Sequence, residues 1–183
     1  PPLPGPHGIG DLGLEAHGFI DFLAATAQSY WQFLPVGPTS MGFDNSPYTS
    51  LSAMAGNPML ISPDLLVGQG LLKEGDFAEN PTFSEYYVEF EKVVACKDRL
   101  LHLAFRRFQQ QGPVSDFDRF CREEFAWLDD FALFMANREA NELKAWYEWP
   151  RSIAVRERVA LKDCRQWLFN AIEYHKFLQY IFF

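Results

Sequence analysis

The chain has 183 residues, of which 48% are hydrophobic and 16% aromatic, enough to build the core of one ordinary domain. Its formal net charge of −8, without a basic patch, excludes nucleic acid and anionic membrane surfaces from the expected partners. Because the sequence has no apolar run of about 18 residues and no charged-then-apolar leader, we expect no membrane partner and predict a cytoplasmic protein.

The first predicted element is a glycine-rich loop. Gly8, Gly10 and Gly13 spell G-x-G-x-x-G, the spacing of a dinucleotide-binding loop. Such a loop needs a buried strand before its first glycine and an acid about 20 residues later. The residues before Gly8 read PPLPGPH, whose prolines cannot donate to a strand ladder, and the next strand-like run ends without an acid. We therefore predict a turn-rich loop that leads into a helix, and no cofactor.

A helix and a strand are predicted next. Apolar spacing indicates a helix over Leu14–Ala25, and the run YWQFL over Tyr30–Leu34 indicates a strand. This pair is typical of an α/β protein, so the expected fold class is α/β. Further along, Ser62 as N-cap, Pro63 at the first helical position and Asp64 in the first turn predict another helix.

The chain is predicted to be helical from about residue 83. The segments QQQGP and NELKAWYEWPR separate three long helices, each with an apolar stripe. The predicted stripes are Val94, Leu101, Ala104, Phe105 and Phe108 on the first helix; Phe117, Phe120, Cys121, Leu128, Phe131, Ala132 and Met135 on the second; and Ala160, Cys164, Trp167, Leu168, Ala171, Leu178 and Phe182 on the third. The chain accordingly divides into a mixed part, residues 1–70, and a helical part, residues 71–183.

Most polar side chains of the helical part favour structural roles. The adjacent acids at 123–124 and 129–130 point about 100° apart on a helix, which favours a solvated face over a catalytic pair. His175 follows an apolar stripe, which favours a hydrogen-bonded core residue over a ligand. We predict no metal site, because acids and cysteines are missing at ligand spacing from His7, His17 and His102. The cysteines form no C-x-x-C pair and are expected to be buried free thiols, namely Cys96, Cys121 and Cys164.

The loop over residues 36–50 is the candidate site. It follows the predicted strand, and the carboxyl ends of strands in α/β proteins are where binding sites form. Sugars present hydroxyls around an apolar face, so a sugar site needs polar groups beside an aromatic ring. Tyr48 offers the ring, Asp44, Asn45 and Ser46 offer the polar groups, and Pro47 stiffens the backbone. The alternative is an ordinary turn rich in Asn, Ser and Pro.

Four segments, in this order, closely resemble the N-terminal part of the 4-α-glucanotransferases, the amylomaltase or disproportionating-enzyme family, glycoside hydrolase family 77. The segments are LPGPHGIGDLG (3–13), YWQFLPVGPTS (30–40), NSPYTSLSAMAGNPMLISPDLL (45–66) and WYEWP (146–150). The similarity covers nearly the whole chain and is dense in the first 66 residues. Four ordered motifs are much more specific than any one of them.

The resemblance implies the N-terminal part of a (β/α)8 TIM barrel with a large helical insertion, truncated at both ends. Residues 1–70 would supply early strands, a helix and rim loops of the cleft, and residues 71–183 the helical insertion that leads toward the next strand. In this family the glycines of residues 8–13 would shape a loop after the first barrel strand. The catalytic carboxylates would lie beyond Phe183, so we name no catalytic residue.

The resemblance also implies an activity. These enzymes transfer α-1,4-glucan segments from a donor glucan to glucose or a maltooligosaccharide, with retention, through a glycosyl-enzyme intermediate. Tyr48, with Ser46, would contact the donor sugar near the cleaved bond. The loop MGFDNSPY is about two residues longer than the usual family loop, and Met41 stands where an aromatic residue can occur, which affects rim contacts and chain-length preference.

Two alternatives remain open at this point. One is a non-catalytic glucan-binding or helical interaction module, and the other is a hydrolytic relative of the amylases, which differs in its acceptor. The enzyme requires further strands that carry an Asp, a Glu and another Asp at their ends. We therefore expect residues 1–183 alone to have no transglycosylation activity.

Overall fold

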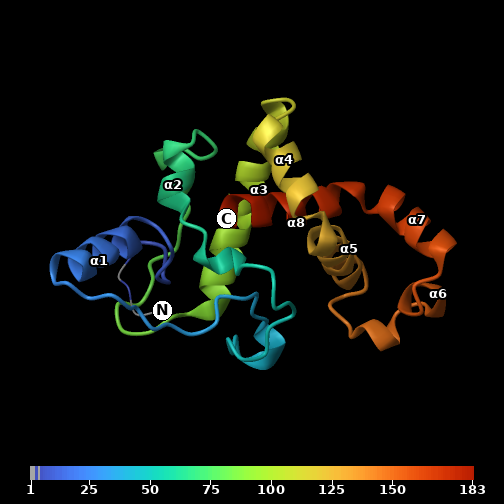
Figure 1. Cartoon of the computed structure of the whole chain (residues 1–183), viewed down its shortest axis with the longest axis horizontal. Coiled ribbons are helices and arrows are strands. Elements are labelled where there is room, and N and C mark those ends of the chain that lie inside the picture. Colours follow the sequence, from blue (N-terminus) through green and yellow to red (C-terminus); the bar gives the residue numbers. More distant parts are fainter. Residues whose placement is uncertain (1–2, 4) are drawn as a thin grey trace. The chain divides into compact units, whose positions relative to one another are not determined.

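The computed structural model describes residue 3 and residues 5–183, and the regular elements of this part of the chain are helices (Figure 1). Two compact units are distinguished, Pro1–Pro113 with Phe182–Phe183, and Val114–Ile181. Over the described residues, no helix combines the length and the apolar content that crossing a membrane requires. The elements, with η for 3-10 turns, are α1 (Leu14–Ala25), η1 (Met41–Phe43), η2 (Pro58–Leu60), α2 (Pro63–Gly68), η3 (Glu74–Phe77), α3 (Phe90–Gln110), α4 (Ser115–Glu123), α5 (Phe125–Ala140), η4 (Trp146–Glu148), α6 (Arg151–Ala154), α7 (Arg158–Trp167) and α8 (Phe169–Phe182).

Two helices of the first unit begin where the sequence predicts. α1 has the predicted bounds, and α2 follows Ser62 at the N-cap with Pro63 at its first position. Proline suits this position because it lacks the N–H that would otherwise be unpaired there. The side chain of Ser62 makes no cap hydrogen bond. Its Oγ lies instead against Gly13, where an added Cβ would approach it to 2.3 Å.

α3 carries much of the core of the first unit, and α2 packs against it. Four of the five predicted stripe residues are buried, which confirms the helical phase. The fifth, Val94, is only half-buried, and Val93 is fully buried in its place, because the buried rows run from Val93 through Lys97 to Leu101 at i+4 spacing. The buried residues of α3 are Val93, Cys96, Lys97, Leu100, Leu101, Ala104, Phe105 and Phe108.

The second unit is helical, but the two long helices predicted there are each divided. α4 and α5 meet at Glu124, and α7 and α8 meet at Leu168. The stripe prediction fails at Trp167, the last residue of α7, which is 77% exposed. The core of this unit comprises Ala132, Leu133, Ala136, Leu161, Cys164 and Ile172, with Ile153, Leu168 and Ala171 packed against it.

The predicted strand is not formed. Tyr30–Leu34 has neither strand nor helical structure, and Tyr30, Phe33 and Leu34 are 94%, 61% and 57% exposed. A strand requires a neighbouring strand to receive its backbone hydrogen bonds, and the described residues contain no strand. The α/β class is therefore not visible in this part of the chain, although local propensity favours a strand. The boundary between the compact units lies at residues 113–114, and the division at residue 70 into barrel and insertion stays a prediction.

Candidate functional site

The glycine-rich loop is a structural loop, as predicted, and packs on the segment that leads into α2. Leu12 N–H donates to the carbonyl of Leu60 at 2.9 Å, and Gly13 N–H donates to Asp11 Oδ1 at 2.9 Å. Gly8 has φ +76°, and a Cβ there would lie 2.3 Å from the ring of Phe83. Glycine is thus needed at residue 8 for both its backbone conformation and this close contact. Residues 1, 2 and 4 of the preceding segment lie outside the described residues.

The loop 36–50 is closed at its base. The N–H of Asn57 donates to the carbonyl of Val36 at 2.8 Å, and its Nδ2 donates to Thr39 Oγ1 at 3.2 Å. On the other side, Gly37 faces Ser50: a Cβ on Gly37 would lie 2.4 Å from Ser50 Oγ. The two ends of the loop lie so close together that no side chain fits at residue 37. Glycine is therefore required there.

The tip of the loop is formed by tight turns that leave the tyrosine ring outside. Asp44 and Asn45 have φ values of 51° and 52°, a conformation that Asp and Asn tolerate better than most residues. Ser46 Oγ accepts from Tyr48 N–H at 3.3 Å, and the carbonyl of Ser46 accepts from Thr49 N–H at 3.2 Å. The side chain of Tyr48 is 75% exposed. The ring is therefore largely open to solvent rather than packed in the core.

The four predicted site residues lie on one short turn, but they are not equivalent. Ser46 and Asn45 are used inside the loop: Ser46 holds the turn, and Asn45 Nδ2 lies 3.1 Å from Met41 Sδ. Asp44 is exposed, and its N–H donates to the carbonyl of Met41 at 3.2 Å, but its carboxylate forms no hydrogen bond or ion pair with another described residue. The structure thus leaves a carboxylate and a phenol exposed, while the amide and the hydroxyl shape the turn.

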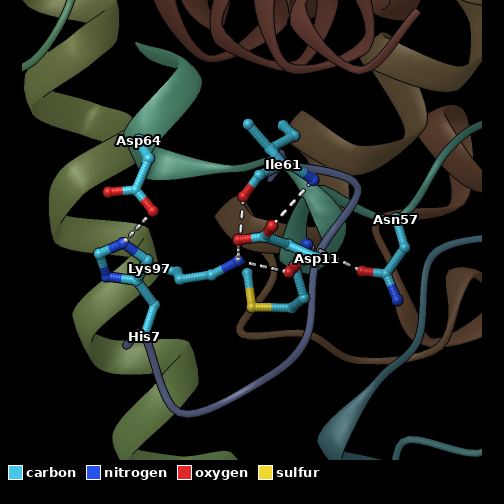
Figure 2. Close-up of polar contacts among 8 residues, drawn as sticks. His7, Asp11, Asn57, Ile61, Asp64 and Lys97 are labelled. Carbon is cyan, nitrogen blue, oxygen red and sulfur yellow. Dashed lines mark hydrogen bonds and ion pairs between the residues drawn. The ribbon is translucent and has the colours of Figure 1, made fainter. Parts of the chain in front are cut away.

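Sequence reasoning missed one residue that bears on this loop. Lys97 of α3 is 1% exposed, and its Nζ lies 2.7 Å from the carbonyl oxygen of Met59, 2.9 Å from that of Ile61 and 3.4 Å from Asp11 Oδ2 (Figure 2). Burial lowers the pKa of this ammonium, and the carboxylate of Asp11 opposes that change. The sequence signal that could have identified Lys97 is its spacing, which places it on the same helical face as the predicted apolar stripe of α3.

Two histidines, His7 and His175, take structural positions. The Nε2 atom of His7 lies 3.2 Å from Asp64 Oδ2, and its ring packs on Phe77 with 5.0 Å between centroids (Figure 2). His175 is buried, as predicted for a core residue, with Nε2 3.1 Å from Glu139 Oε1 in a direction that does not suit a hydrogen bond. In the described part of the chain, no three His, Cys, Asp or Glu side chains form a group that could hold a metal ion.

The adjacent acids are only partly solvated. Asp130 is exposed, yet it accepts two hydrogen bonds from Arg156 Nη2 at 2.9 and 2.8 Å, and Asp129 lies 2.7 Å from Lys176 Nζ. The side chains of Asp129 and Asp130 are 47% and 58% exposed, in keeping with the predicted solvated face, and cations from neighbouring segments also reach them. Neither acid is paired with another acid in a catalytic arrangement. The cysteines are free, with Cys96 and Cys164 buried and Cys121 half-buried.

A hollow of about 300 Å³ is lined by residues between 79 and 99, outside the loop 36–50. Arg99, at its wall, donates to the carbonyl of Asp76 at 3.0 Å and to Asn80 Oδ1 at 2.8 Å, and burial raises the pKa of the neighbouring Cys96 thiol. A thiol with a raised pKa is a poor nucleophile at neutral pH. The lining is Glu79, Pro81, Lys92, Ala95, Cys96 and Arg99, and it lacks an acid pair for glycosyl transfer.

This chain is similar in sequence to proteins of one family. A family model described as 4-alpha-glucanotransferase, of glycoside hydrolase family 77, matches residues 2–183. The 4-alpha-glucanotransferases of Synechocystis sp. and Aquifex aeolicus are 44% and 43% identical over 184 and 181 residues, and each alignment covers 99% of this chain. The chain spans 36% of the length of each of these relatives.

The similarity extends to a solved structure. An amylomaltase from Streptococcus agalactiae, in complex with acarbose, superposes with a TM-score of 0.90 at 40% sequence identity. The alignment covers 98% of this chain and 36% of that chain. These findings confirm the family that the four motifs predicted. The roles of Asp44, Asn45, Ser46 and Tyr48 stay predictions.

Proposed function

Because this chain belongs to the 4-alpha-glucanotransferase family, glycoside hydrolase family 77, we propose that it is part of an enzyme that transfers α-1,4-glucan segments. The donor is an α-1,4-glucan, and the acceptor is glucose or a maltooligosaccharide. The observation that carries this proposal is the family match over nearly the whole chain, together with the shared fold of an amylomaltase.

The remaining part of the enzyme supplies what this part lacks. A retaining mechanism needs one carboxylate as nucleophile and a second as acid and then base, with a further acid to stabilise the oxocarbenium-like transition state. None of the acids described above has such a partner, so the proposal places the catalytic acids in the remaining length. In the full (β/α)8 barrel, the exposed run Tyr30–Leu34 pairs with other strands and its apolar side chains become covered. The proposed location is cytoplasmic.

The loop 36–50 contributes to the sugar cleft in this proposal. The exposed ring of Tyr48 stacks on the apolar face of a glucose unit, and the Asp44 carboxylate accepts hydrogen bonds from sugar hydroxyls. The turn held by Ser46 and the fixed φ of Pro47 reduce the conformational entropy that Tyr48 loses on binding. Support comes from the exposure of the ring and from the closed base of the loop.

The test uses maltotriose disproportionation by the full-length enzyme. Covering an aromatic side chain contributes about 1.5–3 kcal/mol, so Tyr48→Ala is expected to lower kcat/KM for the donor by roughly 10- to 150-fold. Tyr48→Phe retains the ring and should keep most of the activity. Tyr86→Ala is the matched control, because Tyr86 is 92% exposed in the same unit but outside the loop.

The outcomes separate the proposal from its alternatives. Wild-type kinetics in Tyr48→Ala would remove Tyr48 from the cleft. Release of glucose without longer products would favour a hydrolytic relative of the amylases. Binding of glucan without any turnover by the full-length protein would favour a non-catalytic module.

A further inference from the structure

Lys97 is a buried cation whose donors all have acceptors. An ammonium group has three N–H donors and no acceptor. The contacts of Lys97 Nζ match this number, with two backbone carbonyls at 2.7 and 2.9 Å and one carboxylate oxygen at 3.4 Å. Burying an unpaired charge costs several kcal/mol, so such a residue persists only where these acceptors are in place. The contacts of Lys97 therefore order the chain segments that carry these acceptors.

Two of the acceptors belong to the turn that directly precedes α2, and the third, Asp11, belongs to the glycine-rich loop. Met59 lies within the 3-10 turn η2, and Ile61 follows it, so their carbonyls have no helical partner of their own. The carbonyl between them, of Leu60, accepts from Leu12 N–H at 2.9 Å. Three successive carbonyls are thus held by groups from α3 and from the glycine-rich loop, as Figure 2 shows for Ile61 and Lys97.

Asn57 connects this turn with the loop 36–50. Its Oδ1 accepts from Met59 N–H at 3.0 Å, and its Nδ2 donates to Thr39 Oγ1 at 3.2 Å. Its own N–H donates to the carbonyl of Val36 at 2.8 Å. One residue, 9% exposed, therefore bonds both the turn that Lys97 holds and the base of the loop that carries Tyr48.

From this chain of contacts we propose that Lys97 is a positioning residue for sugar transfer: by holding the 57–61 turn, it fixes the base of the loop 36–50 and so the place of Tyr48. The catalytic part of this inference rests on the proposed function. The structural part, that Lys97 orders the loop, does not. A lysine without substrate contact would then affect donor turnover through Asn57.

The first measurement is hydrogen–deuterium exchange of the full-length enzyme. Lys97→Met keeps an unbranched apolar stem but removes the donors, and we expect amide exchange in the loop 36–50 to rise about tenfold or more. Lys92→Met is the matched control, because Lys92 lies on the same helix but is 51% exposed. Thr39→Val removes only the hydroxyl at the loop end of the contact chain and should give a smaller rise in the same peptides. This variant carries the test if Lys97→Met does not fold.

The second measurement is a double-mutant cycle on maltotriose turnover. Lys97→Met is expected to lower kcat/KM for the donor about tenfold in the wild-type background and less than about threefold in the Tyr48→Ala background, because both changes act through one loop. Additive effects would overturn the proposal, since they indicate general destabilisation. Unchanged loop exchange in both Lys97→Met and Thr39→Val would also overturn it. If loop exchange rises but the wild-type enzyme transfers no glucan, the proposed function fails while the ordering of the loop by Lys97 stands.

Discussion

The absence of a side chain at residue 37 gives the sharpest test of the loop geometry. In Gly37→Ala, the new Cβ would lie 2.4 Å from Ser50 Oγ, 3.1 Å from Ser50 Cβ and 3.1 Å from the carbonyl oxygen of Ser52. Rotation of Ser50 can relieve only the first contact, at the expense of its hydrogen bond of 2.8 Å to the Ser52 carbonyl. The backbone oxygen cannot move away without shifting the chain, so the base of the loop must open.

The expected size of this effect follows from overpacking and lost hydrogen bonding. Inserting a methyl group into a filled position costs about 1–3 kcal/mol. If opening the base displaces Tyr48, the full-length enzyme should lose roughly 5- to 150-fold in kcat/KM for maltotriose, at 1.4 kcal/mol for each factor of ten. Glucose release at several donor concentrations measures this value, and thermal unfolding shows whether the global stability changes as well.

Two further variants make the interpretation of Gly37→Ala specific. Gly42→Ala adds the same methyl group to the same loop, but its nearest neighbour, Ser40 Oγ, is 3.8 Å away, so activity should be unchanged. Combining Gly37→Ala with Ser50→Gly removes two of the three close contacts and should restore part of the lost activity. Equal activities for Gly37→Ala and Gly42→Ala would refute the closed-base geometry.

Two predictions concern other parts of the chain. The hydrogen bond from Arg107 holds the pKa of the Asp76 carboxyl below its usual 3.8, so the stabilisation from this pair is present above that pH and is lost as the pH falls through the folded pKa. Asp76→Asn should therefore lower the unfolding free energy by about 1–3 kcal/mol at pH 7. Denaturant titrations should show this difference shrinking at lower pH. Burial raises the pKa of Cys121 to about 11, so its alkylation by iodoacetamide should accelerate up to that pH, and a rate that levels off near pH 9 would contradict the buried setting.

Local sequence signals predicted the elements that depend on neighbouring residues. The bounds of α1 and the start of α2 follow from apolar spacing and from the Ser62-Pro63 pair. The segment 36–50 was predicted as a loop, and its four candidate residues do share one turn. Different roles within that turn could not be predicted, because the inward use of Asn45 and Ser46 depends on backbone conformation.

Features that depend on distant segments were missed or wrongly predicted. The strand at Tyr30–Leu34 requires partners that the described residues do not contain, so propensity alone could not decide its structure. Lys97 was overlooked because a charged residue within an apolar stripe is easily assigned to solvent. Its acceptors lie 36, 38 and 86 residues away in sequence, beyond any local pattern.

The long sequence separation between Lys97 and its acceptors has a consequence during synthesis. Met59 is added 38 residues before Lys97, which corresponds to roughly 2–8 s at translation rates of about 5–20 residues per second. Throughout this interval the nascent chain contains Met59 but not the ammonium group that holds its carbonyl. The chain of contacts from Lys97 to the base of the loop 36–50 is therefore completed only after Tyr30–Leu34 and the loop itself have been synthesised.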